Sequence, residues 1–366
     1  MKKLIYYLII SFLLSPNSVL LSQTDRVGSD KVNDGPYIFI QKNNAFKVKW
    51  ITNNKLFEEQ LTPENFDVVQ RKFNLLCNYK ELLYNYSKNS DHSQNYKGID
   101  SIIVISDLHG KYNNYINLLK SMGVIDNDLN WKFGKGHFVV LGDIFDRGDM
   151  VTEILWHLFG LENQAAEAGG KLHVLLGNHE VMVLGNSTGY INEKYKKVEK
   201  ISKTRYFRLY SKNTVLGSWI RSKPVVISIN DILFVHGGIS RESVRRNLTT
   251  TRTNQIFADK IIGNEMIKES KNEEELFLIQ DYGPIWYRGY FEDIQFNENK
   301  LDSILHFYDK KHIVVGHTSS GGIISRFNNK LFGIDAGLGN DMPGEVLKIL
   351  NGIFYKGNTS GKIIKL

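Results

Sequence analysis

The sequence predicts an α/β fold with a mixed sheet, because buried strands alternate with amphipathic helices along most of the chain. Continuous apolar runs such as "DSIIVIS" from Asp100 and "GHFVVLGD" from Gly136 are typical of strands that are covered on both faces. Between these two runs, apolar residues recur at helical spacing: Tyr115, Leu118, Leu119 and Met122. Alternation of this kind indicates helices layered on a sheet.

Residues 23–98 are expected to form a small N-terminal β and helical extension ahead of a main domain at 99–366. Two apolar segments on either side of "QKNN" (41–44) predict a β-hairpin. Thr62 and Pro63 predict the start of a helix with these residues on one face: Phe66, Val69, Phe73 and Leu76. The Asn- and Ser-rich residues 84–98 are interpreted as a linker. The hairpin is also a candidate for docking a partner or the cell surface.

The main domain continues with a helix over 150–170 and a strand that begins at Lys171. Asn230 and Asp231 separate two later apolar runs in the manner of a hairpin turn, which makes that pair antiparallel and the sheet mixed. Two polar, helix-rich insertions, roughly 185–220 and 240–280, interrupt the strand pattern. The later strands are expected at 223–230, 231–238, 311–318 and 330–337.

The composition is that of a globular protein, with 42% hydrophobic and 23% charged residues in a chain of 366. The net charge of +7 is modest and no dense block of Lys and Arg appears, so no nucleic acid is expected as a specific partner. A mildly positive surface favours anionic substrates. Cys77 is the only cysteine, which excludes an intramolecular disulfide and argues against a Cys-based metal site.

Residues 1–22 have the order of parts found in a secretory signal peptide. Two lysines precede the apolar run from Leu4 to Leu14, and small and polar residues lead to an expected cleavage point near Ser22 and Gln23. The apolar run is short for a membrane span. We expect an exported protein, periplasmic or secreted, with no stable membrane span after cleavage. The alternative is an uncleaved membrane anchor.

Five strand ends are followed at once by polar residues that can bind metal ions or phosphate. The loops beyond the carboxyl ends of strands are where an open α/β sheet binds ligands. The residues are Asp107 and His109; Asp143, Asp146 and Arg147; Asn178, His179 and Glu180; His236; and His317. A lone Asp at such a place is usually a helix cap and a lone His a core residue, but five such strand ends together are hard to explain in that way.

Carboxylate oxygen, amide oxygen and imidazole nitrogen suit manganese, zinc or iron. Two such cations need a bridging ligand, and Asp143 stands where a bridging carboxylate is expected. His173 and His312 lie at strand starts and are interpreted as structural. Asp335 follows a late strand and is expected to serve a turn rather than the site.

The motif set "SDLHG", "GDIFDRG", "GNHE", "HGG" and "GHT" resembles that of calcineurin-like metallophosphoesterases, and more narrowly the phosphoprotein phosphatase type. The match covers about residues 100–340 in the family's order. The segment "GPIWYRGY" (283–290) resembles the substrate-arginine segment of bacterial, Shewanella-like members. One departure is Ser106 ahead of Asp107, where the family usually has Gly. The resemblance implies a four-layer α/β/β/α sandwich.

The resemblance also implies roles for single residues. His179 would donate a proton to the leaving oxygen and be oriented by Asp146. Arg147 and Arg288 would grip phosphate oxygens, although Arg288 could instead be an exposed arginine on an aromatic loop. The first metal would be held by Asp107, His109 and Asp143, and the second by Asp143, Asn178, His236 and His317.

The expected reaction is hydrolysis of a phosphomonoester by direct attack of a metal-bound hydroxide, with a phosphoprotein (Ser/Thr or Tyr) as the favoured substrate. No covalent enzyme intermediate is expected, because the sequence shows no activated Ser or Cys. One alternative is a nucleotide, diadenosine polyphosphate or phosphodiester hydrolase with the same metals. The other is an exported, non-catalytic protein that binds phosphoesters.

Overall fold

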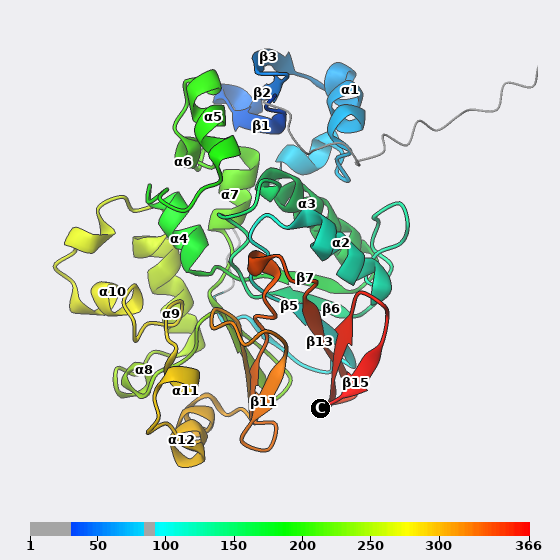
Figure 1. The fold of residues 1–366 in the computed structure, drawn as a ribbon. Coiled ribbons are helices and arrows are strands. Elements are labelled where there is room, and N and C mark those ends of the chain that lie inside the picture. The colour runs from blue at the N-terminus through cyan, green and yellow to red at the C-terminus, as the bar shows by residue number, and fades with distance from the viewer. Residues whose placement is uncertain (1–30, 84–91) are drawn as a thin grey trace, which may run out of the picture. The chain divides into compact units, whose positions relative to one another are not determined.

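Three β-sheets organise residues 31–83 and 92–366, the part of the chain that this computed structural model describes (Figure 1). The first sheet is small and antiparallel, in the order β1-β2-β3. Its strands are β1 (Asp34–Ile40), β2 (Phe46–Thr52) and β3 (Lys55–Leu61). The expected hairpin around residues 41–44 is therefore confirmed, while β3 was not predicted from the sequence.

The other two sheets have six strands each and are both mixed. The first, in the order β11-β12-β10-β9-β8-β4, contains β4 (Asn95–Tyr96), β8 (Val226–Ile229), β9 (Ile232–Val235), β10 (His312–Val315), β11 (Ile324–Arg326) and β12 (Leu331–Gly333). The second, in the order β15-β14-β13-β5-β6-β7, contains β5 (Ser101–Ile105), β6 (His137–Val140), β7 (Lys171–Val174), β13 (Glu345–Leu350), β14 (Ile353–Asn358) and β15 (Ile363–Lys365).

Alternation along the buried strands explains why these two sheets pack face to face. In β5, Ile102 and Val104 belong to a core that also contains Ile227 and Phe234 of the other sheet. Ile103 and Ile105 point to the opposite face and join the core under the helices. Both faces of each strand are therefore apolar, as the continuous apolar runs predicted. The expected α/β/β/α layering is confirmed.

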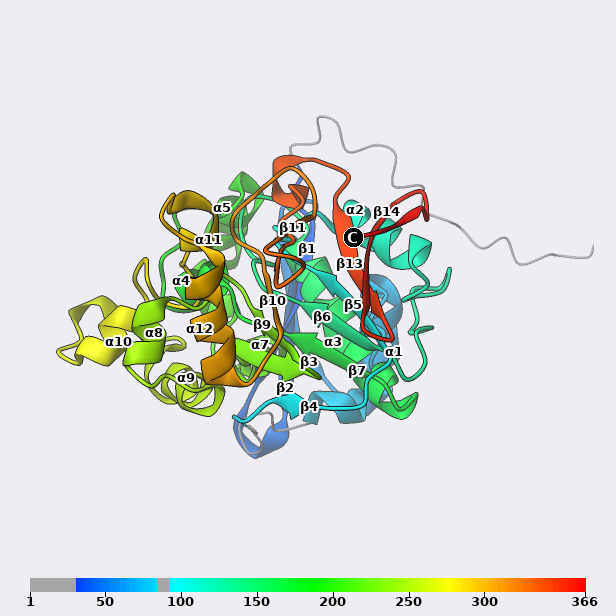
Figure 2. The same cartoon turned by 90° about the horizontal axis from the view of Figure 1, so that it is seen from below.

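Helices cover the two outer faces (Figure 2). The sheet that contains β5 to β7 is covered by α2 (Tyr112–Ser121) and α3 (Val151–Glu167), and the other sheet by α9 (Thr250–Ile256) and α12 (Glu298–Tyr308). The two expected insertions are helix-rich, as predicted. They hold α5 (Glu193–Ser202), α6 (Tyr206–Leu209) and α7 (Val215–Arg221), then α8 (Arg241–Arg245), a π-helix (Phe257–Ile261) and α10 (Glu273–Leu278). Two further short helices are α4 (Asn178–Leu184) and α11 (Gly289–Glu292).

Three features of the N-terminal part differ from expectation or lie beyond it. The helix α1 (Pro63–Phe73) begins where Thr62 and Pro63 predicted, but it ends at Asn74, which has a left-handed φ of 50°. Leu76 is therefore outside the helix. Within the expected linker, β4 pairs with β8, because Ser228 and Asn230 donate main-chain hydrogen bonds to Gln94 and Tyr96. The expected signal peptide, 1–22, and residues 84–91 of the linker lie outside the described residues.

Residues 32–366 form one compact unit, which includes both the N-terminal sheet and the two large sheets. The boundary expected at residue 98 stays a prediction. Among the helices of the described residues, none combines the length and apolar character needed to cross a bilayer.

Candidate active site

The predicted site residues converge where β5, β6, β7, β9 and β10 end. Because β5, β6 and β7 are parallel neighbours, and so are β9 and β10, their carboxyl ends meet at one edge of the sandwich. The six predicted metal ligands and His179 are each at most 6% exposed: Asp107, His109, Asp143, Asn178, His179, His236 and His317. The fold thus brings seven polar groups that are far apart in sequence into one buried cluster.

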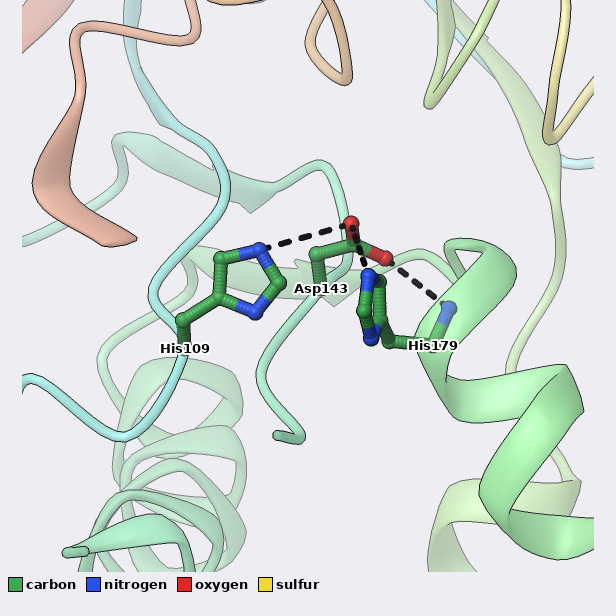
Figure 3. Close-up of side chains that lie close together, drawn as sticks. All are labelled: His109, Asp143 and His179. Carbon is green, nitrogen blue, oxygen red and sulfur yellow. Dashed lines mark hydrogen bonds and ion pairs between the residues drawn. The ribbon is translucent and has the colours of Figure 1, made fainter. Parts of the chain in front are cut away.

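Asp143 lies at the centre of this cluster (Figure 3). Its Oδ2 is 3.7 Å from Nε2 of His109 and 3.8 Å from Nε2 of His179, and its Oδ1 accepts a hydrogen bond from the main-chain N–H of His179. The same Oδ2 is 3.2 Å from Nε2 of His236. Asp143 thus belongs to two groups of possible metal ligands, one with His109 and His179, the other with His236 and His317. A carboxylate shared by two groups is what a bridging ligand requires.

Hydrogen bonds fix which ring nitrogen of His109 and of His236 faces Asp143. Nδ1 of His109 donates to the carbonyl of Phe145 at 2.8 Å, and Nδ1 of His236 donates to the carbonyl of Leu141 at 2.7 Å. A carbonyl can only accept, so these Nδ1 atoms carry the protons and Nε2 can offer its lone pair when the ring is neutral. Imidazoles that bind metal are usually oriented in this way.

The donor set fits divalent cations on further grounds. Nε2 of His317 is buried and has no hydrogen-bond partner among the described residues, as expected of an atom reserved for another ligand. Nε2 of His236 lies 3.0 Å from Oδ1 of Asn178, which places the amide oxygen beside the second group of ligands. These oxygen and nitrogen donors match the preferences of manganese, zinc and iron.

The pKa values describe a site with concentrated negative charge. Burial lowers the pKa of His109 to about 3 and that of His317 to about 2, which keeps both rings neutral and able to bind metal. Burial opposes a charged His236, but the Asp143 carboxylate outweighs burial and raises the pKa of His236 to about 9. Burial also raises the pKa of Asp107 to about 7, and the nearby Asp335 carboxylate adds to this shift. A bound cation would relieve the repulsion between these carboxylates.

Asp335 was expected to serve a turn, and it does so: its Oδ1 accepts from the N–H of Gly337 at 3.0 Å. It is also 8% exposed and close enough to Asp107 to raise the pKa of that carboxyl. Asp107 in turn accepts from the N–H of His317 at 3.0 Å. Asp335 is therefore part of the site's electrostatics as well. Its position after β12, another strand end, was the available signal.

Glu180 holds the loop that carries Asp143, a role that the sequence did not reveal. Its carboxylate is fully buried and accepts four main-chain N–H bonds. The donors are Asp143 (2.7 Å), Ile144 (2.7 Å), Phe145 (3.2 Å) and Gly177 (2.7 Å). Gly177 also permits the close approach, because a Cβ there would lie 2.2 Å from Oδ1 of Asp143. Glu180 thus joins the loop after β6 to the start of α4.

We expect Glu180→Gln to lower the free energy of unfolding by about 3 kcal/mol, because a neutral amide has one acceptor oxygen and turns its NH₂ toward main-chain N–H groups. Denaturant unfolding measures the loss. Glu167→Gln, at an exposed position, is the matched control and should change stability by less than about 0.5 kcal/mol. Equal stability of the two variants would contradict this role.

His179 and Asp146 form a buried pair. Nδ1 of His179 is 2.5 Å from Oδ2 of Asp146, and Asp146 is fully buried. Burial disfavours the charged imidazole, but Asp143 and Asp146 outweigh burial and raise the pKa of His179. Because Asp146 holds Nδ1, Nε2 is the nitrogen that remains to act on a substrate. Nε2 also lies within reach of a metal near His109, so geometry alone allows His179 to be an acid or a ligand.

The two predicted arginines lie at the rim. Nη1 of Arg147 donates to Oδ1 of Asn340 at 3.3 Å, and a Cβ on Gly339 would meet both His109 and Arg147. Arg147 is therefore next to the first group of ligands. Nη1 of Arg288 donates to the carbonyl of His317 at 2.8 Å, which places Arg288 beside the second group.

The site has one buried carboxylate that is shared by two sets of imidazoles, and it lies at the edge where two stacked sheets end. This arrangement is typical of a metallohydrolase. Residues 101–320 match the family model described as "Calcineurin-like phosphoesterase". The chain belongs to this family, and the resemblance seen in its motifs is confirmed. It is a hydrolase of phosphoesters, and its family works with divalent metal ions.

The chain is similar in sequence or in fold to phosphatases from three organisms. The chain is 30% identical to "Shewanella-like protein phosphatase 1" of Plasmodium berghei over 72% of this chain and 74% of the relative. Its fold is similar to the crystal structure of a cold-active protein-tyrosine phosphatase of a psychrophilic Shewanella, with a TM-score of 0.83, 35% identity, and coverage of 91% and 99% of the two chains. A serine/threonine phosphatase of Saccharomyces cerevisiae shares the fold, with a TM-score of 0.52, 18% identity, and coverage of 80% and 84%.

Proposed function

We propose that this chain is a phosphoprotein phosphatase that hydrolyses phosphomonoesters directly at a site for two metal ions. The observation that carries the proposal is Asp143, which belongs to both groups of possible ligands. One ion, manganese, zinc or iron, would be held by Asp107, His109 and Asp143; the other by Asp143, Asn178, His236 and His317. Bound ions would polarise the phosphoryl oxygens and activate a water molecule as the nucleophile.

The chain's own side chains would supply the remaining steps. The guanidinium groups of Arg147 and Arg288 would bind phosphate oxygens from two sides of the site, as planar forks suited to paired oxygens. Nε2 of His179 would give its proton to the leaving oxygen, because an alkoxide leaves poorly unless it is protonated. Asp146 would hold the imidazole in place and stabilise its charged form.

Aromatic rings on two sides of the site favour a phosphotyrosine-containing substrate. Tyr190 is 61% exposed, and its ring lies edge-on to that of His179 with centroids 5.6 Å apart. Trp286 packs in the same manner against His317, also at 5.6 Å. A phenyl ring attached to the phosphate could pack against either. The similar Shewanella structure is that of a protein-tyrosine phosphatase, which agrees with this proposal.

We also propose export. The support is the signal-like order of residues 1–22. Detection of a mature N-terminus near Gln23 outside the cytoplasm would support it, and a full-length cytoplasmic protein would refute it.

The first test is an aryl phosphate assay of protein that begins near Gln23, with manganese, zinc, iron or no added metal, and then with a chelator. We expect turnover that depends on metal and is lost on chelation. A panel of phosphotyrosine and phosphoserine peptides, nucleotides and phosphodiesters then ranks the substrates, with phosphotyrosine peptides expected to give the highest kcat/KM. Folded protein that binds metal yet hydrolyses none of these compounds would indicate a phosphoester-binding protein instead.

A further inference from the structure

Residues 190–195 brace the main chain around Arg147. The N–H of Arg147 donates to the carbonyl of Tyr190 at 3.0 Å, and Nδ2 of Asn192 donates to the carbonyl of Arg147 at 2.8 Å. Lys194 and Tyr195 both donate side-chain hydrogen bonds to the carbonyl of Asp149, at 2.5 and 3.1 Å. The N–H and the carbonyl of Arg147 and the carbonyl of Asp149 are thus all hydrogen-bonded to residues 190–195.

Residues 190–195 are in turn anchored to β1, the first strand of the described residues. Nζ of Lys194 is 2.7 Å from Oδ1 of Asp34 in β1, and the Asp34 side chain is fully buried. The other oxygen of Asp34 accepts from Tyr37 and, at 3.4 Å, from Thr152 at the start of α3. Helix α5, which carries Lys194, lies beside the N-terminal sheet (Figure 1). Separating a buried charge pair leaves each charge uncompensated, so Lys194 and Asp34 are expected to stay in contact.

The Arg147 loop needs this support. Asp146 and Arg147 have φ angles of 71° and 62°, a left-handed conformation that costs free energy in residues with a side chain. Among the described residues, the Arg147 side chain makes one hydrogen bond, to Asn340. Its direction is therefore set mainly by the main chain that carries it.

We propose that Asn192, Lys194 and Asp34 are positioning residues that act through Arg147, so that the N-terminal sheet sets the geometry of the phosphate-binding arginine. This inference rests on the proposed function, because it takes Arg147 as a phosphate ligand. It gives the N-terminal extension a role within the enzyme, rather than only as a docking surface.

The test uses Lys194→Met, which keeps the length of the side chain but removes the ammonium group, and Asp34→Asn. We expect the inhibition constant for inorganic phosphate, and the KM for an aryl phosphate, to rise on the order of 10- to 100-fold, because small misplacements of a binding group are costly. The ratio of activities on aryl and alkyl phosphates should stay unchanged, since His179 is not displaced.

A second experiment separates positioning from general loss of structure. In an Arg147→Ala background, Lys194→Met should cause no further loss of kcat/KM, since the group that it positions is gone. Equal losses with and without Arg147 would overturn the proposal. If wild-type enzyme is active and Lys194→Met leaves the inhibition constant for phosphate and the KM unchanged, the proposal is also overturned. Inactive wild-type enzyme would count against the proposed function instead.

A milder variant covers the case in which Lys194→Met fails to fold. Asn192 both caps α5 and binds the Arg147 carbonyl, whereas Asn297 caps α12 in the same manner without contacting the loop. Asn192→Ala should speed hydrogen exchange at the Arg147 amide and weaken phosphate binding about tenfold, while Asn297→Ala should do neither. The same behaviour in both variants would mean that only the helix cap matters.

Discussion

Asp143→Asn is expected to remove essentially all turnover, by about 1,000-fold or more, and to lower the metal content of the purified protein. Asparagine has nearly the same size, but it lacks the charge that both groups of ligands share through Oδ2. The measurements are kcat on an aryl phosphate and metal per chain by elemental analysis. In metal-free protein, the pKa of His236 should also fall, because Asp143 is the group that raises it.

Asp128→Asn is the matched control, because it makes the same substitution at an exposed position away from the site. It should keep both metal and activity. If Asp143→Asn retained the metal stoichiometry of wild type, the bridging role of this residue would be wrong even if activity were lost.

His179→Ala is expected to reduce kcat on alkyl phosphates by about 100- to 10,000-fold, the usual contribution of a general acid. The loss on aryl phosphates should be smaller, because a phenolate leaves with less need of protonation. Metal content should be unchanged. This last measurement decides between the two roles that the geometry allows, since loss of metal would make His179 a ligand rather than the acid.

Asp146→Asn offers a milder test of the same pair. Burial disfavours the imidazolium of His179, but Asp143 and Asp146 outweigh burial and raise its pKa. The proton-donating imidazolium therefore persists at pH values above the ordinary pKa of histidine. It is lost as the pH rises through the raised pKa. Removing the Asp146 charge should therefore shift the basic limb of the kcat profile to lower pH. A profile identical to that of wild type would show that this limb belongs to another group.

The chemistry-bearing loops could be predicted because they follow directly from local sequence. Asp107, Asp143 and His317 each come at the end of a continuous apolar run, and parallel neighbours bring such ends to one edge. Arg288 depended on one short segment with a resemblance, and the structure places it at the carbonyl of His317.

Other features were not predicted from the sequence. The strands β13, β14 and β15 were not predicted. β13 pairs with β5, whose residues lie more than 200 positions away in the sequence, whereas β14 and β15 extend the sheet by antiparallel pairing with β13 and β14. The four hydrogen bonds to Glu180 and the charge of Asp335 near Asp107 arise in the same way, from loops that meet only after folding.

The sequence by itself indicated an α/β fold with a mixed sheet, the positions of its main strands along the chain and the polar residues that follow them, because periodicity and strand ends are properties of neighbouring residues. The resemblance of its motifs added the four-layer arrangement and the phosphoesterase site. Only the tertiary structure decided that Asp143 lies in two groups of possible metal ligands, and that Asp34 in β1 reaches the loop of Arg147 through Lys194. Such contacts depend on the packing of distant segments, and no pattern along the chain encodes their distances.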